Sequence, residues 1–203
     1  NKTASIELKN LNEKPVISLL NSFSAPVIVE FKQPIDDLFA ILEFETDFTS
    51  MWITKKKLDY IVLEKIASDQ PNVENVISRV YEILINKMDK RSLLAKLLEP
   101  LNDNEYFSRL LETTTPDPKA MQTALRKYED LYIRFFKEFS ITYLKNFIHN
   151  RQYLRENSNY QERMLACALT FLNRGTNFLD DFLDIIFNTS NNMSLKLSCL
   201  VNY

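Results

Sequence analysis

The sequence predicts a mainly α-helical protein, a partial helical superhelix of the HEAT or armadillo kind, preceded by a short β segment. Apolar residues recur at spacings of three and four over most of the 203 residues, which is the period of a helix. Glycine occurs once, at Gly175, which disfavours tight hairpins and phosphate-binding loops because these need positive φ. Short helical segments joined by Asn, Asp and Pro resemble a solenoid, although no fixed-period repeat is visible. The period changes at residue 33, which divides the chain into residues 1–32 and 33–203.

The first part reads as strands at Ser5–Lys9 and Val27–Lys32. Ile6 and Leu8 alternate with charged residues, and a β-branched run follows Pro26. A lone pair of strands is marginally stable in water. We therefore expect the rest of their sheet to lie outside this chain.

The second part reads as helices in series. Pro34 is expected in the first turn of the first helix, and Thr49 or Ser50 is expected to cap the second. The predicted helical segments are 34–42, 49–66, 71–84, 93–98, 106–111, 117–150, 160–173, 178–187 and 194–203. The longest carries an aromatic stripe from Tyr128 to Phe147, which at this spacing indicates core packing in preference to a binding groove.

Composition limits the partners. A net charge of −2 and a pI near 5.6 give no basic surplus for nucleic acid or an anionic membrane. No window approaches the roughly 18 uninterrupted apolar residues of a membrane span. The opening residues contain neither an initiator Met nor a secretory signal, and the last helical pattern is uncapped. We expect a fragment of a longer, cytoplasmic protein.

The two cysteines, Cys167 and Cys199, lie in apolar helical patterns and are expected as buried thiols in a reducing compartment. A disulfide between them stays open, because sequence separation does not fix the distance between them. His149 is the only histidine, so a zinc site with two or three imidazole ligands cannot be built from this chain. Its place near a helix end suits the negative end of the dipole. Apolar neighbours would raise the pKa of Cys167, which disfavours a catalytic Cys167–His149 pair.

The charged runs are interpreted as solvated helix faces. Asp180 and Asp184 share a face beside Asp181, yet carboxylates one turn apart are more often exposed than part of a metal site or an acid–base pair. The runs Lys55–Lys57 and Lys87–Arg91 lack interleaved aromatics, so they do not indicate nucleic-acid binding. No catalytic, cofactor-binding or metal-binding residue is therefore predicted in this chain.

The segment Leu11–Phe31 carries a more specific signature. Its motifs are Glu13-Lys14-Pro15-Val16, Ser18-Leu19-Leu20 and Phe23-Ser24-Ala25-Pro26-Val27. They resemble the junction between the β-sandwich and C-terminal helical domains of aminopeptidase N, the bacterial alanyl-aminopeptidase type of zinc metallopeptidase. Two further anchors follow in order. The first, at the start of the helical domain, is Thr46-Asp47 with Trp52, where Met51 stands in the place of a common Arg. The second resembles an Asn-Met-Thr-Asp helix start and reads Asn191-Asn192-Met193-Ser194, with Leu195 in place of Asp. The family's Arg-Asn pair is replaced by Leu165-Ala166.

The resemblance implies that residues 1–32 are terminal strands of the sandwich, and that residues 33–203 are the N-terminal half of the superhelical domain. The parent enzyme would remove N-terminal residues from short peptides with a zinc-activated water. The family's H-E-x-x-H and G-A-M-E-N motifs are absent here, so zinc belongs to the parent and this chain should be inactive alone. Its expected partners are the catalytic domain of the same polypeptide and the peptides in the enclosed chamber. The alternative is a free-standing helical scaffold that binds partner proteins through a solenoid groove.

Overall fold

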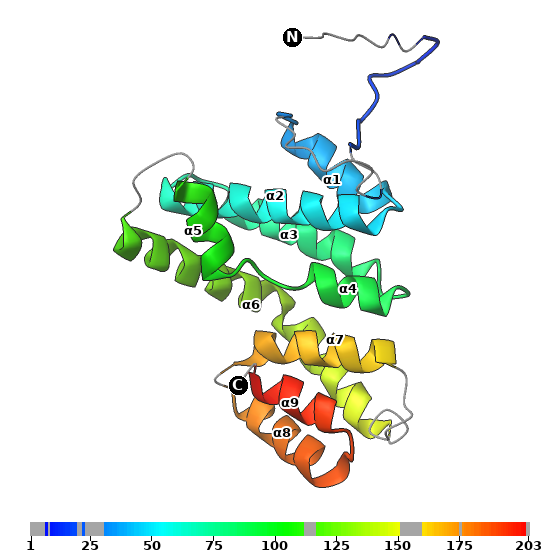
Figure 1. The fold of residues 1–203 in the computed structure, drawn as a ribbon, viewed down its shortest axis with the longest axis vertical. Helices are drawn as coiled ribbons and strands as arrows, with labels where there is room; N and C mark the ends of the chain where they lie inside the picture. Colours follow the sequence, from blue (N-terminus) through cyan, green and yellow to red (C-terminus); the bar gives the residue numbers. More distant parts are fainter. Residues whose placement is uncertain are drawn as a thin grey trace.

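The chain is helical throughout its main body. The computed structural model describes residues 7, 9–19, 22, 31–111, 117–150, 160–174 and 176–201. Within these ranges it forms nine α-helices and one 3₁₀ turn (Figure 1). The elements are α1 (Ile35–Phe44), α2 (Phe48–Ala67), α3 (Val73–Ile85), α4 (Arg91–Leu97), α5 (Asp103–Leu111), α6 (Pro118–His149), α7 (Tyr160–Thr170), η2 (Phe171–Asn173), α8 (Asn177–Thr189) and α9 (Met193–Val201). The mainly α prediction is confirmed for this part of the chain.

The predicted β segment is not shown. The described residues of the two expected strands, which include Phe31 and Lys32, have no regular structure, and the others lie outside the described ranges. Residues 9–19 form an irregular segment that runs away from the helices (Figure 1). A strand is held by hydrogen bonds to a neighbouring strand. The described residues offer this segment no such neighbour.

Helix α6 is the spine of the fold. Its aromatic stripe is buried, as the spacing predicts, with Tyr128, Tyr132 and Phe136 almost fully covered. The N-terminal part packs on α2 and α3, where the ring of Phe136 meets that of Tyr81 edge to face at 5.0 Å. The C-terminal part packs on α7 and α8, where the Phe147 ring lies 6.5 Å from the ring of a phenylalanine of α8. One helix thus joins two helical groups, α1–α5 and α7–α9 (Figure 1).

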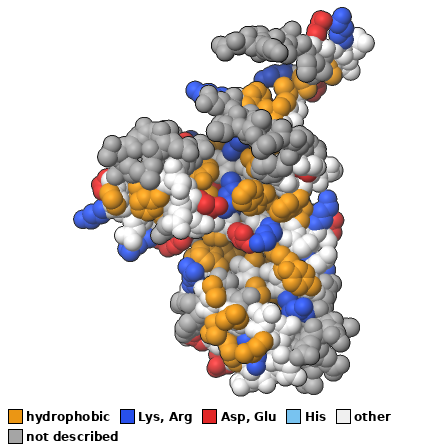
Figure 2. Space-filling view, viewed as in Figure 1, with side chains coloured by type: hydrophobic (Ala, Val, Ile, Leu, Met, Phe, Trp, Pro, Cys, Tyr) orange, Lys and Arg blue, Asp and Glu red, His pale blue; other side chains and the backbone are white. Residues whose placement is uncertain are grey.

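The described helices do not show the superhelix that the sequence predicts. Helix α4 packs on α7 across the two groups, while α8 and α9 pack on each other at the far end. A regular superhelical rise is not evident among the described residues. None of the described helices has the length and hydropathy of a membrane span. The face in Figure 2 mixes apolar, acidic and basic side chains without a field of one sign.

The caps follow ordinary helix chemistry, with two corrections. Pro34 is the N-cap residue directly before α1 and does not lie in its first turn. Helix α6 begins as predicted, with Asp117 accepting from the Lys119 N–H. Helix α2 is capped by Asp47, not by Thr49 or Ser50, because its carboxylate accepts from the Ser50 N–H at 2.8 Å. Asp47, Thr49 and Ser50 each carry an oxygen that can accept from a helix N–H, and the prediction named only the two hydroxyls. The backbone path into the helix decides among them.

Two carboxylates share the corner between α1 and α2. Glu45 Oε1 accepts from the N–H groups of Thr46, at 2.7 Å, and Asp47, at 3.1 Å. The hydroxyl of Ser18 and these two N–H groups lower the pKa of Glu45 below 4.5. The N–H of Ser50 lowers the pKa of Asp47 below 3.8. Both groups therefore stabilise the fold most in their ionised form.

These lowered pKa values predict a loss of stability in acid. The contribution is complete above the unfolded values of 4.5 and 3.8, and it is lost as pH falls through the folded pKa values. The double variant Glu45→Gln, Asp47→Asn keeps the acceptor oxygens but does not titrate. Urea unfolding should show the wild type losing more stability than this variant between pH 6 and pH 3. An equal loss in both proteins would contradict the prediction.

Candidate functional site

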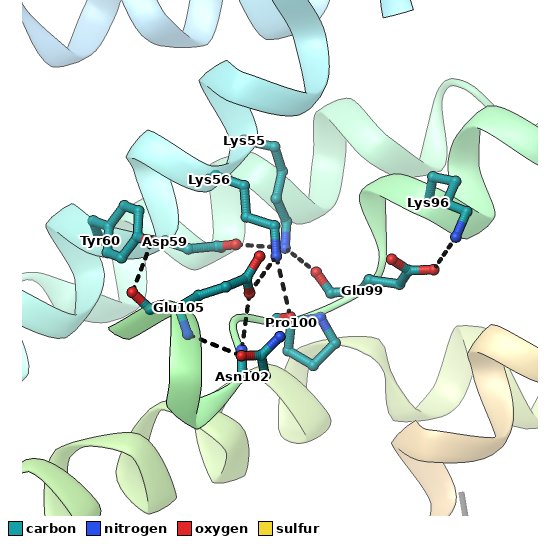
Figure 3. Close-up of polar contacts among 9 residues, drawn as sticks. All are labelled: Lys55, Lys56, Asp59, Tyr60, Lys96, Glu99, Pro100, Asn102 and Glu105. Atoms are coloured by element: carbon teal, nitrogen blue, oxygen red, sulfur yellow. Dashed lines mark hydrogen bonds and ion pairs between the residues drawn. The ribbon is translucent and has the colours of Figure 1, made fainter. Parts of the chain in front are cut away.

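Two lysines of the Lys55–Lys57 run on α2 are buried, contrary to the sequence interpretation. Lys55 is 1% exposed and Lys56 is 9% exposed, while Lys57 is half-buried and donates to Gln33 Oε1 at 3.3 Å. Figure 3 shows Lys55 and Lys56 pointing together toward the connection between α4 and α5. The prediction of a solvated face is therefore wrong for this run. Oxygen atoms from elsewhere in the fold replace the water that a lysine normally requires.

Lys55 is held by two oxygens and an aromatic ring. Its Nζ lies 2.7 Å from Asp59 Oδ2 and 3.1 Å from the Glu99 carbonyl oxygen. The same atom lies 4.8 Å from the centre of the Tyr132 ring. Burial lowers the pKa of Lys55 and raises the pKa of Asp59, and the charge of each partner opposes the shift of the other.

Two tyrosines of α6 cover the Lys55–Asp59 ion pair. The hydroxyls of Tyr128 and Tyr132 are fully buried, and neither makes a hydrogen bond of standard geometry within the described residues. Burial, followed by the negative charge of Asp59, raises the pKa of both phenols well above 10, so both stay protonated. A lysine sealed in this way is out of reach of a substrate. Its role is to hold the α4–α5 connection against α2.

Lys56 binds the start of α5. Its Nζ lies 2.9 Å from Glu105 Oε2 and 3.4 Å from the Pro100 carbonyl oxygen. Glu105 also accepts from the Asn102 N–H at 3.1 Å, and Asn102 Oδ1 accepts from the Glu105 N–H at 2.9 Å. This reciprocal pair is a capping box (Figure 3). Tyr60 adds a hydrogen bond from its hydroxyl to the Glu105 carbonyl oxygen at 3.3 Å.

A groove of about 850 Å³ opens beside this cluster, between the two helical groups. We call it the α4–α7 groove. Trp52 and Lys56 of α2 line it together with Glu105 of α5, Arg163 and Cys167 of α7, and Leu195 of α9. Lys56 Nζ lies 5.7 Å from the Trp52 ring centre, so the lysine covers an aromatic wall. The lining combines apolar walls with charges of both signs.

One ion pair links the two helical groups, from α4 to α7. Arg91 of α4 lies 2.6 Å from Glu162 of α7, whose side chain is only 3% exposed. The Tyr143 hydroxyl of α6 donates to the same carboxylate. The run Lys87–Arg91 is therefore partly structural, because Lys87 also donates to the Glu43 carbonyl oxygen at 2.9 Å.

The remaining candidates lie on α6 and α8. His149 ends α6, and its Nδ1 lies 2.6 Å from the Lys145 carbonyl oxygen. Asp180, Asp181 and Asp184 are exposed on α8. Within the described ranges no group of three His, Cys, Asp or Glu residues is placed to hold a metal ion.

The comparisons with known proteins give no family. No protein-family model matches this chain, and no solved structure matches it. The likeness to aminopeptidase N therefore rests on the sequence motifs alone.

Sequence reasoning missed the buried cluster, although one signal was available. Lys55 and Asp59 stand four residues apart on a helix, which is the spacing of an ion pair. The same spacing occurs on exposed faces throughout proteins. Burial could not be read from it, because the covering atoms come from α4, α5 and α6.

The buried pair should show strong coupling in a double-mutant cycle. Lys55→Met leaves Asp59 buried without its cation, and Asp59→Leu leaves the ammonium unpaired, so each should lower the free energy of unfolding by about 3–5 kcal/mol. The double variant Lys55→Met, Asp59→Leu should lose much less than the sum, because it leaves no lone charge. Urea unfolding measures all four proteins.

The matched control is the exposed pair Lys96–Glu99, whose atoms lie 2.8 Å apart. The same cycle there, with Lys96→Met and Glu99→Leu, should give a coupling of about 1 kcal/mol or less. Similar coupling energies at the two sites would show that burial of Lys55 carries no special energetic role.

Proposed function

We propose that this chain is a non-catalytic portion of a zinc-dependent aminopeptidase N, and that it helps to form the enclosed chamber in which the parent enzyme removes N-terminal residues from peptides. The signature over Leu11–Phe31 is the observation that carries the proposal. The chain becomes helical at Ile35, directly after this signature, which is the order that the resemblance implies. In this proposal residues 33–203 begin the C-terminal helical domain.

Two anchors of the resemblance fall at helix starts. Asp47 caps α2 through the Ser50 N–H. Asn192 plays the same part at α9, where its Oδ1 accepts from the Leu195 N–H at 2.8 Å. A cap is a position where Asp, Asn, Ser and Thr are preferred for a physical reason. These positions therefore support a shared helical layout, and they do so independently of the junction signature.

The segment before the helices also fits a larger protein. Its large apolar side chains are exposed, among them Leu11 at 52%, Val16 at 44% and Ile17 at 43%. An extended segment with several exposed apolar residues gains stability by packing on another surface. In the proposed parent that surface is the rest of the β-sandwich, so the junction would tie the helical domain to the catalytic part of the same polypeptide.

The chemistry must then come from elsewhere in the parent. The family's zinc-binding and amine-binding motifs are absent from this sequence. The chain's own contribution would be shape: helices that close a chamber and admit short peptides. The α4–α7 groove supplies a wall of mixed polarity to which a peptide backbone could bind.

The second candidate is a free-standing helical scaffold that binds a partner protein. The same groove favours it, since a surface between two helical groups is a common place for a bound segment. The coding sequence upstream of Asn1 separates the two proposals. An H-E-x-x-H segment a few hundred residues before Asn1 supports the peptidase, and a start codon at this point supports the scaffold.

The isolated chain should lack peptidase activity. We expect a helical circular dichroism spectrum and no hydrolysis of alanyl-coumarin, with or without added zinc. A commercial aminopeptidase in the same buffer serves as the positive control, and treatment with a chelator reports metal dependence. Hydrolysis by the folded chain that is abolished by the chelator would overturn the assignment of a non-catalytic role.

A further inference from the structure

Two thiols meet at the contact between α7 and α9. Cys167 of α7 is half-buried and lines the α4–α7 groove, whereas Cys199 of α9 is fully buried. Cys167 makes the largest contribution to the raised pKa of Cys199, which places the two thiols within interaction range of each other. The helices that carry them pack together, and Leu195 of α9 lines the same groove one turn before Cys199. The sequence left a pairing of these cysteines open, and the fold packs the two helices that carry them against each other.

The two thiols have unequal surroundings. The hydrogen bond to Cys167, followed by burial, raises the pKa of Cys199 well above its ordinary value, so this thiol keeps its proton. Cys167 instead faces a groove that a small molecule can enter. Arg163 stands one helical turn before it and lines the same groove. Lys56 and Lys96 add two more cations to the lining, against the carboxylates of Glu99 and Glu105.

We propose that Cys167 is a thiol-modification site for small anionic disulfides of the glutathione class, and that Cys199 resolves the adduct into an intramolecular disulfide between α7 and α9. An accessible cysteine beside a second, protected cysteine is the arrangement that such a two-step exchange requires. The proposal does not depend on the function proposed above.

The exchange balances in two steps. The Cys167 thiolate attacks one sulfur of glutathione disulfide, so a Cys167–glutathione bond forms and one glutathione thiolate leaves with the proton taken from Cys167. Cys199 then attacks Cys167 Sγ, which forms the Cys167–Cys199 bond and breaks the bond from Cys167 to glutathione, and the proton of the Cys199 thiol passes to the glutathione thiolate that leaves. The two cysteine thiols are oxidised by two electrons, and glutathione disulfide is reduced to two thiols.

The disulfide would fasten α9 to the body of the protein. Among the described elements, α9 has its extensive contacts with α7 and α8. Its outer side chains Met193, Leu197 and Val201 are 65–75% exposed. A bond from its buried face to α7 closes a loop of about 30 residues. The groove would keep its shape, because Cys167 and Leu195 would then be held on one rigid unit.

The test uses the purified chain with both cysteines reduced. Incubation with glutathione disulfide, followed over time by intact mass, should show a transient gain of one glutathionyl group and then a species lighter than the reduced chain by two hydrogens. Proteolysis without reductant should yield one linked pair of peptides, containing Cys167 and Cys199. The apparent Tm should rise by about 5–10 °C and should return after treatment with dithiothreitol.

Single variants identify the order of events. Cys199→Ala should trap the glutathione adduct on Cys167, and Cys199→Val serves as a second variant with a filled site. Cys167→Ala should react at least tenfold more slowly than the wild type, because Cys199 is buried. A first adduct on Cys199, a persistent adduct in the wild type or a disulfide between two chains would overturn the proposal. Circular dichroism checks that each variant is folded.

Discussion

The buried ammonium of Lys55 is the constraint on which the middle of this fold depends. A charge 1% exposed must find oxygens, and the fold provides the Asp59 carboxylate and the Glu99 carbonyl. The second of these belongs to the connection between α4 and α5. The hydrogen bond from Lys55 to the Glu99 carbonyl oxygen therefore holds the path of this connection, which has no helix or strand of its own. The adjacent Lys56 continues the same attachment into the first turn of α5.

Helix α6 carries this constraint to the rest of the molecule. Its first half covers the lysine cluster with Tyr128 and Tyr132, and its second half supports α7 and α8. The Ser140 hydroxyl donates to the Leu169 carbonyl oxygen at 3.0 Å, which ties the spine to the end of α7. The α4–α7 groove follows from this arrangement. Helix α6 joins the two helical groups, and residues of both groups line the groove.

The two proposals meet at the α4–α7 groove, whose lining combines cationic, anionic and aromatic side chains. In the proposed function this surface would hold a peptide or a partner segment, and the aminopeptidase parent would supply the metal and the reaction. The proposed thiol exchange would add chemical control at the same wall, since Cys167 lines the groove and belongs to a helix that packs on α9.

The sequence by itself determined the helical class, the long α6, its aromatic core stripe and the exposed acidic residues of α8, because each depends on spacing along one helix. Only the tertiary structure decided that Lys55 and Lys56 are buried, that Asp47 caps α2, and that Cys167 meets Cys199. The burial of the lysines and the packing of the two cysteine-bearing helices depend on elements that are distant in the chain, whereas the cap of α2 depends on the local backbone path into the helix. Local pattern reports which face of a helix is apolar, whereas burial of a charge and contact between two thiols depend on what the fold places against that face.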